Sequence, residues 1–336
     1  MVTAPRGLTL WNDPFLRVRR AADAKLAAID PAAVSSVAVI KHAALGDLVL
    51  TRPFLLETRR HFPSARIVLG LASNYRRGAP LDLVDSVHVV ERGLPWRRAL
   101  RNYRELGTHD VLFDLTGTAR SRWLVLLNRP DLAVGLAGSR LDGRLYDVVV
   151  PRGGFKYEAE TFLDLLQAVG LPVGWPPEFA LPLPPRPQAA PYVLHFVTAS
   201  TPGKSWPADR FAQLARALAV ARPGQTQVLL AGIADWEQAV AVRLRADLAG
   251  VPGLVVLPRE AELEAWCAHA TVCVANDTGA RNLAIAFGTP TVGVFFDTPP
   301  FRYLPRFGRH EAVFAPCRAL PEVADVAAAV LRLVPA

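Results

Sequence analysis

The sequence predicts an α/β protein built from two halves, each with a parallel sheet covered by helices. Short apolar runs rich in β-branched residues alternate with helical patterns, as expected for sheets that are buried on both faces. A proline-rich stretch at 181–191 interrupts this alternation, which then begins again. The chain has 336 residues, 51% hydrophobic and 20% charged, so it is long enough for two domains and too apolar to be disordered.

The first half begins with the buried run Val37–Ile40, which predicts a strand, and a helix is expected from Leu48 to His61. The other expected elements of this half are strands at 66–71, 87–90 and 110–115 and a helix at 96–106. Residues 1–35 precede this pattern and hold a basic run at 16–20 and a short helical stretch at 21–29. This leader predicts a helix that caps the domain or, as the alternative, a basic surface anchor.

The prolines of residues 181–191 fix φ and forbid a helix, so this stretch is expected to be an extended linker. The expected elements that follow are strands at 192–197, 227–232, 254–257, 272–275 and 291–295 and helices at 208–221, 236–248, 260–269, 280–287 and 321–333. The predicted organisation is an extension at 1–35, a domain at 36–180, the linker, a domain at 192–320 and a C-terminal helix at 321–336. Because ligands bind at the carboxyl ends of parallel strands, a cleft between the two sheets is the expected site.

The charge balance narrows the classes of partner. The 38 basic residues exceed the 30 acidic ones and give a net charge of +8, which suits nucleic acid, an anionic membrane surface or acidic substrates. The arginines are spread along the chain and no nucleic-acid-binding motif appears, so no nucleic-acid partner is expected. Lysines are scarce, and two of them, Lys41 and Lys204, fall inside the motifs described below.

Cysteine and histidine usage argues against a metal site. The three cysteines form no CxxC pair and the seven histidines are scattered, so we expect no disulfide framework, metal or cofactor. The chain lacks a run approaching the ~18 apolar residues of a membrane span. It also lacks the apolar core of a signal peptide near its start. We therefore expect a cytoplasmic protein.

The first motif follows the strand at 37–40 and reads Lys-His-Ala-Ala-Leu-Gly-Asp-Leu-Val-Leu-Thr-Arg-Pro over residues 41–53. Gly46 is expected to close a loop with positive φ, and Asp47 is expected to open the next helix as its N-cap. A carboxylate at the carboxyl end of a strand is also a candidate general base. The motif alone leaves both interpretations of Asp47 open.

The second motif is the hydroxyl-rich loop at 198–209, directly after a predicted strand. Its Gly203-Lys204-Ser205 is similar to the end of a P-loop, but Thr198 stands where that pattern requires the first glycine. A loop with several hydroxyl groups and one lysine before a helix still suits a diphosphate. A solvated lysine in a surface loop is the alternative.

The third motif is Asn276-Asp-Thr-Gly279, where a buried strand passes into a helix of small residues. Backbone N–H groups at a helix start favour an anion, and small residues allow close approach of a ligand. The alternative is an ordinary helix cap with a tight turn. A helix cap would require only Asp277 or Thr278, and it would not explain the other residues of the motif.

Together the three motifs resemble glycosyltransferase family 9, the lipopolysaccharide heptosyltransferases. The family pattern (R/K)xxxxGD, followed by a hydrophobic residue and then xxTxP, corresponds to residues 41–53. The family loop K-x-W-P corresponds to 204–207, and the segment NDxGxxHxAxAxGxP corresponds to 276–290. The resemblance covers about residues 36–334 in order and spacing.

The resemblance implies a GT-B fold with an N-terminal acceptor domain and a C-terminal nucleotide-sugar domain. It implies inverting, metal-independent transfer of a sugar from a nucleotide-diphospho-sugar, typically ADP-heptose, to a lipopolysaccharide-core or related acceptor. In this sequence Asp47 would be the general base and Lys204 would stabilise the leaving diphosphate. The other implied donor-site residues are Thr198, Ser200, Asp277, Thr278, Gly279 and Asn282, and the implied acceptor-side residues are Lys41, Gly46 and Thr51.

The sequence departs from the family pattern at Asn282, where the family usually has histidine. Asparagine can donate a hydrogen bond but cannot carry charge or move a proton. The departure leaves room for another donor or acceptor, for a non-catalytic nucleotide-sugar-binding protein, and for a nucleotide-sugar epimerase of the same fold. Base recognition is expected around 257–262, and Asp235 or Glu237 is a candidate to hold a ribose hydroxyl. A peripheral contact with the inner face of the membrane is also left open.

Overall fold

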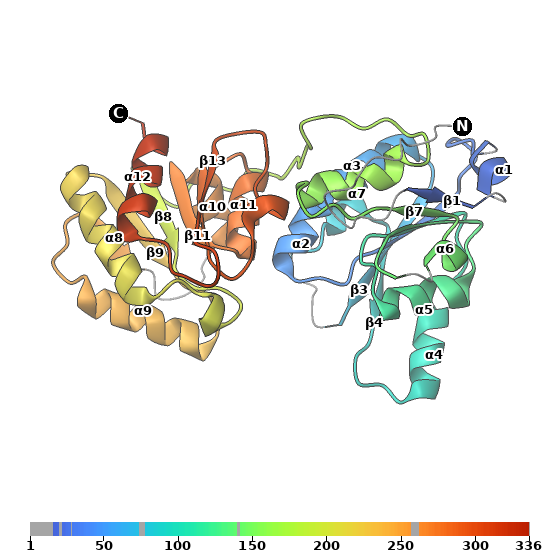
Figure 1. The fold of residues 1–336 in the computed structure, drawn as a ribbon, viewed down its shortest axis with the longest axis horizontal. Helices are drawn as coiled ribbons and strands as arrows, with labels where there is room; N and C mark the ends of the chain where they lie inside the picture. The colour runs from blue at the N-terminus through green and yellow to red at the C-terminus, as the bar shows by residue number, and fades with distance from the viewer. Residues whose placement is uncertain are drawn as a thin grey trace. The chain divides into compact units, whose positions relative to one another are not determined.

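The computed structural model describes residues 16–19, 22–27, 29–73, 78–139, 142–256 and 262–335. The chain divides into two compact units, Met1–Phe179 and Ala180–Ala336. Each unit is an α/β structure, and the division falls next to the proline-rich stretch (Figure 1). Residues 181–191 form neither helix nor strand.

The N-terminal unit is built on a seven-stranded sheet with the order β1-β7-β6-β5-β2-β3-β4. Its strands are β1 Arg17–Val18, β2 Ser36–Ile40, β3 Arg66–Ala72, β4 Ser86–Val90, β5 Val111–Asp114, β6 Leu132–Leu136 and β7 Val148–Val150. Its helices are α1 Ala22–Ala27, α2 Leu45–Leu50, α3 Arg52–His61, α4 Trp96–Arg104, α5 Ala119–Asn128, α6 Asp142–Leu145 and α7 Glu158–Gln167. All neighbouring strands are parallel except β1, which runs antiparallel to β7.

Helices cover both faces of this sheet. Figure 1 shows α3 and α7 on one face and α4, α5 and α6 on the other. On the α3 side, the rings of Phe54 and Phe113 meet edge to face with centroids 5.2 Å apart. On the other side, Leu124 and Tyr146 pack in one core cluster with Ile40 of the inner strand β2. This double burial explains why the strands read as continuous apolar runs.

The C-terminal unit has a six-stranded, fully parallel sheet with the order β10-β9-β8-β11-β12-β13. Its strands are β8 Tyr192–Phe196, β9 Thr226–Leu230, β10 Leu254–Val256, β11 Val272–Asn276, β12 Thr291–Phe295 and β13 His310–Phe314. Its helices are α8 Ala208–Ala221, α9 Asp235–Asp247, α10 Leu263–His269, α11 Gly279–Ala286 and α12 Val323–Leu333, with 3-10 turns at Pro202–Lys204 and Pro300–Arg302.

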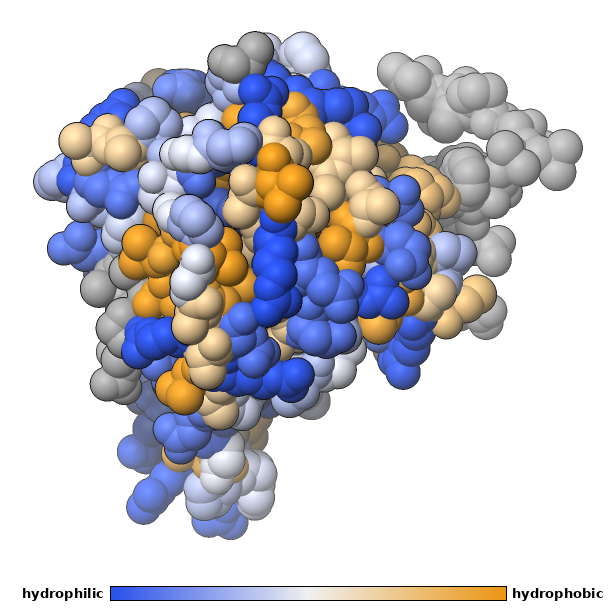
Figure 2. Space-filling model, turned by 90° about the vertical axis from the view of Figure 1, so that its left-hand side faces the viewer, coloured by the Kyte–Doolittle hydropathy of each residue, from blue (hydrophilic) through white to orange (hydrophobic). Residues whose placement is uncertain are grey.

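One core of this unit joins the sheet to α8, α9 and α12, with Trp206 and Phe211 among its largest buried side chains. Helices α10 and α11 lie on the other face of the sheet (Figure 1). Figure 2 looks onto the side of the unit that carries α8 and α9, and apolar and hydrophilic side chains are interspersed there. No described helix is long and apolar enough to cross a bilayer.

Several expected elements differ from the structure. The helix expected from Leu48 to His61 is two helices, α2 and α3, which meet at Thr51 because Pro53 stands in the first turn of α3. The strand β6 was not expected from the sequence. A Cβ at Gly135 would lie 2.6 Å from the Tyr146 ring, so the packing requires glycine there.

The leader joins the sheet of the N-terminal unit. Arg17–Val18 forms the edge strand β1, so a helix covers only part of the leader. Lys25 of α1 donates a hydrogen bond of 3.0 Å to Asp147, directly before β7. These contacts support the interpretation of α1 as a helix that packs on the domain. Residues 1–15, 20, 21 and 28 of the leader lie outside the described residues.

Candidate active site

In the N-terminal unit, the segment after β2 enters helix α2 earlier than the sequence predicted. Ala44 is the N-cap, and its extended conformation (φ −76°, ψ 174°) supplies the turn without a glycine. Gly46 is the second residue of α2 and not a loop residue with positive φ, which corrects the expectation for it. Asp47 is the third residue of the helix and not its N-cap.

The Asp47 carboxylate lies half-buried in the first turn of α2. A negative charge is favourable at this end of a helix. The Thr51 hydroxyl donates a hydrogen bond of 2.8 Å to the Asp47 backbone oxygen, one turn away. Among the described residues, none is recorded as a hydrogen-bond partner of the Asp47 carboxylate itself. Such a carboxylate can accept a proton from a hydroxyl group that is brought to it.

Lys41 points into the N-terminal unit. It is 2% exposed, and its Nζ lies 4.0 Å from a Glu158 carboxylate oxygen and 4.1 Å from the centroid of the Phe162 ring. Glu158 also pairs with Arg152. Lys41 therefore joins the end of β2 to helix α7. Thr51 is fully buried as well, so two of the three acceptor-side candidates face the interior. Their acceptor roles stay predictions.

Sequence reasoning missed His42, which follows Lys41. Neither ring nitrogen has a partner among the described residues, although both nitrogens are buried. Burial, helped by the nearby Arg120, lowers the pKa of His42 to about 4, so the ring is neutral near pH 7. Its backbone N–H donates a hydrogen bond of 2.9 Å to Thr116 after β5. The place of His42 inside the first motif was the available signal.

In the C-terminal unit, Thr198 is used within the fold. It is fully buried, its hydroxyl donates to Glu237 at 2.7 Å, and the same hydroxyl accepts from the Gly232 N–H at 2.9 Å. These bonds tie the end of β8 to the start of α9. Because Glu237 is engaged there, its candidate role at a ribose loses support. Ser200, two residues further on, is exposed.

Lys204 lies at the end of a 3-10 turn and is half-exposed, with its Nζ 3.9 Å from an Asp297 carboxylate oxygen. Lys204, Asp277, Asp297 and Thr298 line one small hollow beside the end of β12. The structure thus brings the lysine of the second motif and the aspartate of the third motif to the same place. The Trp206 N–H donates a 2.7 Å hydrogen bond to Asn276, which fastens the two motifs together.

Helix α11 begins at this hollow. Its N-cap Thr278 is extended (φ −150°, ψ 161°), and its side chain makes no capping hydrogen bond, so the first amides of the helix are left without that acceptor. Gly279 is the first residue of the helix. Such a helix start suits a phosphate group. Asn282 lies in the next turn at 4% exposure, and its side-chain oxygen has no partner among the described residues.

A buried cation that sequence reasoning missed stands behind α11. Arg281 is fully buried, donates a 2.8 Å hydrogen bond to the Tyr303 oxygen and stacks 5.0 Å from the centroid of the Phe295 ring. Gly293 makes room for it, since a Cβ there would lie 2.6 Å from the Arg281 Nε. Nothing in the local sequence separates this arginine from the many surface ones.

The remaining candidates lie outside this hollow. Asp235 is the exposed first residue of α9, which is an ordinary place for a solvated carboxylate. Of the stretch expected to recognise the base, residues 257–261 lie outside the described residues. Within the described part of the chain, no group of three or more histidine, cysteine, aspartate and glutamate side chains is placed to hold a metal ion.

Solved structures of heptosyltransferases are similar to this chain. E. coli heptosyltransferase WaaC with ADP-2-deoxy-2-fluoro heptose matches with a TM-score of 0.70 and 21% identity, over 89% of this chain and 98% of that chain. A putative UDP-N-acetylglucosamine 2-epimerase from Listeria monocytogenes has a TM-score of 0.57 and 12% identity, over 90% of this chain and 88% of that chain. These likenesses confirm the expected GT-B fold.

The sequence comparisons point to the same family. Lipopolysaccharide heptosyltransferase 1 of Pseudomonas aeruginosa is 26% identical over an alignment of 299 positions, and the match covers 79% of this chain and 79% of the relative. The family model described as glycosyltransferase family 9 (heptosyltransferase) matches residues 97–328, a range that contains Lys204 and Asp277 and begins after Asp47. The chain therefore belongs to glycosyltransferase family 9 and is a glycosyltransferase of the heptosyltransferase type.

Proposed function

We propose that this enzyme transfers a heptose from ADP-heptose to a lipopolysaccharide-core acceptor, with inversion at the anomeric carbon and without a metal ion. The observation that carries the proposal is the hollow where Lys204 meets Asp277 at the start of α11. The identity of the donor is supported by the similar E. coli enzyme with an ADP-heptose analogue. The acceptor is supported by the name of the Pseudomonas aeruginosa relative.

The donor's diphosphate would lie against Lys204 and the first amides of α11. As the bond between the anomeric carbon and the diphosphate oxygen breaks, negative charge grows on the leaving group. A lysine and a helix start that already face this charge stabilise it more in the transition state than in the ground state. Lys204 and the helix would thus provide the electrostatic stabilisation, which is why the proposal includes no metal.

Asp47 would act on the acceptor. Its carboxylate would take the proton of the acceptor hydroxyl while that oxygen forms a bond to the anomeric carbon from the side opposite the diphosphate. One new C–O bond forms and one breaks, the diphosphate leaves with the electron pair, and no covalent enzyme intermediate is needed. A single carboxylate is sufficient for this displacement.

A thermal-shift comparison of ADP-heptose with UDP-, GDP- and other ADP-sugars tests the donor. A ligand at 100 times its Kd stabilises the protein by about 2.7 kcal/mol, which is easily measured. We expect ADP-heptose to raise the Tm most. The Lys204→Met variant should lose most of this shift, and Lys156→Met is a matched control, since Lys156 is similarly exposed and pairs with Asp164.

The outcomes separate the parts of the proposal. A larger shift with another nucleotide sugar would replace ADP-heptose as the donor. An equal loss of the shift in Lys204→Met and Lys156→Met would contradict the proposed diphosphate site. Mass spectrometry of the product formed from ADP-heptose and a lipopolysaccharide-core acceptor then tests transfer itself.

An epimerase activity is the second candidate function, because the likeness to the Listeria monocytogenes protein extends over 90% of this chain. Epimerisation would require groups that remove and return a proton at the sugar ring, and Asp277 and Asp297 are the carboxylates at the hollow. An isomerised sugar that forms without any acceptor would support this activity. Transfer only in the presence of an acceptor would exclude it as the main reaction.

A further inference from the structure

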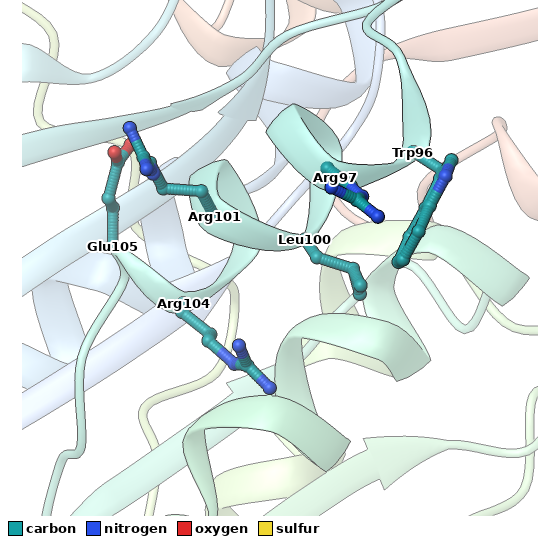
Figure 3. A pocket seen from close by; sticks show the side chains of 6 residues that line it. All are labelled: Trp96, Arg97, Leu100, Arg101, Arg104 and Glu105. Carbon is teal, nitrogen blue, oxygen red and sulfur yellow. The ribbon is translucent and has the colours of Figure 1, made fainter.

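Helix α4 carries a row of arginines and a tryptophan on its outer side. Arg97, Arg101 and Arg104 follow the i, i+4, i+7 spacing that places residues on one face of a helix, and Trp96 and Leu100 lie along the edge of that face. These five residues, with Glu105, line a shallow hollow of about 550 Å³ (Figure 3). We call Trp96, Arg97, Leu100, Arg101 and Arg104 the arginine face.

The opposite side of α4 holds the helix on the N-terminal unit. The Asn102 side chain donates to the Val89 oxygen at 3.0 Å and accepts from the Glu91 N–H at 3.1 Å, which fixes α4 to the end of β4. Tyr103 packs against the core cluster that contains residues of α5. The arginine face is therefore directed away from its own unit. Figure 1 shows α4 projecting beyond α5.

The charges of the arginine face are not neutralised by the fold. In the described chain, no ion pair is recorded for Arg97, Arg101 or Arg104, and α4 itself contains no acidic residue. Arg97 stacks over Trp96, with the guanidinium carbon 5.4 Å from the ring centroid. Glu105, at the end of the helix, is the acidic residue at the rim, and Figure 3 shows it beside Arg101.

Trp96 distinguishes this face from a merely solvated basic helix. Its side chain is 67% exposed, although a tryptophan usually buries most of its area. Indole rings favour the headgroup region of a bilayer, and arginines beside them attract anionic lipids. The combination on one helix face fits the surface of a membrane. A nucleic acid would also match the charge, but α4 belongs to no nucleic-acid-binding motif.

We propose that the arginine face of α4 docks the enzyme on a bilayer that contains anionic phospholipids, with Trp96 inserted at the headgroup level. The proposal rests on the charges and exposure of α4 and not on the sugar that is transferred. If the acceptor is a glycolipid, such docking would hold the N-terminal unit at the surface where that acceptor lies. Docking and transfer can be tested separately.

The test is co-sedimentation of the full chain with vesicles of phosphatidylcholine alone and of phosphatidylcholine mixed with phosphatidylglycerol. We expect binding to the mixed vesicles that weakens as salt is added. Because each arginine near an anionic surface contributes about fivefold to binding, a triple variant Arg97→Glu, Arg101→Glu and Arg104→Glu should reduce binding by about 100-fold or more. Trp96→Ser should reduce binding to the same vesicles by about tenfold or less.

A matched control is Arg243→Glu, Arg245→Glu and Arg306→Glu, which makes the same change in net charge at exposed positions of the C-terminal unit. Equal loss in both triple variants, or no binding by the unmodified chain at low salt, would overturn the proposal. Stronger α4-dependent binding to single-stranded RNA than to the vesicles would replace the membrane by a nucleic acid. Circular dichroism checks folding, and a glutamine version of the α4 triple variant replaces the glutamate version if that one is unfolded.

Discussion

Lys41 and Lys204 carry the same signal in the sequence but have opposite surroundings in the structure. Each is a rare lysine that follows a buried strand inside a motif of the family pattern. Lys41 is buried between Glu158 and the Phe162 ring, whereas Lys204 is half-exposed beside Asp297. A buried cation must be paired to stay charged, while an exposed one is available to a ligand. A lysine in a motif can therefore serve the fold or the substrate.

The same contrast extends to the segments around the two lysines. After β2, Thr51 faces the interior together with Lys41, and the Asp47 carboxylate has no recorded partner among the described residues. Around Lys204, Asp277 lines the same hollow, and the start of α11 adjoins it. The first segment thus contains one candidate base, Asp47, next to residues that are buried in the fold, Lys41 and Thr51. The second combines several groups suited to an anion.

The largest expected effect comes from Asp47→Asn, which tests whether the first segment contributes a catalytic group. Loss of a general base should lower kcat by about 10²- to 10⁴-fold, while the donor binds as before. Rates of nucleotide release in the presence of acceptor measure the effect. The matched control is Asp325→Asn, because Asp325 is also the third residue of its helix, α12, and is exposed.

An unchanged rate in Asp47→Asn would contradict the proposed base and leave the whole segment with a structural role. A similar loss in Asp325→Asn would point to a stability effect common to both helix starts. Thermal unfolding of both variants shows which of the two explanations applies.

Lys41→Met should lower the free energy of unfolding by about 3 kcal/mol, because it removes a cation beside the buried Glu158 carboxylate, which also pairs with Arg152. Lys156→Met, at an exposed pair, should change it by less than about 1 kcal/mol. Urea unfolding measures both changes. A Lys41→Met enzyme that is stable yet inactive would break the contrast with Lys204 and restore Lys41 as an acceptor contact.

The sequence predicted most elements of the C-terminal unit and, in the N-terminal unit, those from β2 to β5, because the buried strands read as apolar runs; the elements from α5 to α7 were not predicted. The expected helix at 208–221 and strand at 291–295 match α8 and β12 in both bounds. The strand β7 was missed although its three residues are all valine. Helix α7 was missed although its apolar residues follow a helical spacing that the sequence shows.

The environment of the candidate site was less accessible to sequence reasoning. The burial of Lys41 depends on Glu158 and Phe162, which lie more than 100 positions further along the chain and meet it only in the folded unit. Thr198 looked like a phosphate ligand because it begins the hydroxyl-rich loop, but its bond to Glu237 also requires the tertiary structure. The local sequence pattern was sufficient to locate the motifs. Which of their side chains remain available to a ligand depends on long-range contacts that appear only in the folded protein.

Buried histidines allow a comparison of how the two units respond to acid. His195 is fully buried in β8, shares a 3.0 Å hydrogen bond with Gln227, and burial lowers its pKa to about 4. Because the unfolded chain binds a proton near pH 6.5 and the folded unit does not, stability is retained above about pH 6.5 and falls between about pH 6.5 and 4. The slope for one such group is at most about 1.4 kcal/mol per pH unit.

We therefore expect His195→Gln, which cannot titrate, to flatten the pH dependence of unfolding measured in urea between about pH 7 and 5. His42→Gln is the corresponding variant in the N-terminal unit, where the pKa of His42 is also lowered to about 4. A pH dependence that neither substitution changes would show that other groups control acid stability in both units.

The smallest effects separate the two hydroxyl groups after β8. Thr198→Val removes the partner of the Gly232 N–H and of Glu237, so it should lower the free energy of unfolding by about 1–2 kcal/mol. Ser200→Ala changes an exposed side chain and should alter stability by less than about 0.5 kcal/mol. If Ser200 meets the diphosphate, Ser200→Ala should weaken donor binding by about fivefold, as expected for one lost hydrogen bond. Calorimetric titration of both variants with the donor measures the difference in donor affinity.

Weaker donor binding in Thr198→Val, with the free energy of unfolding unchanged, would place Thr198 at the ligand instead. Thr198 would then resemble Lys204 more than Lys41.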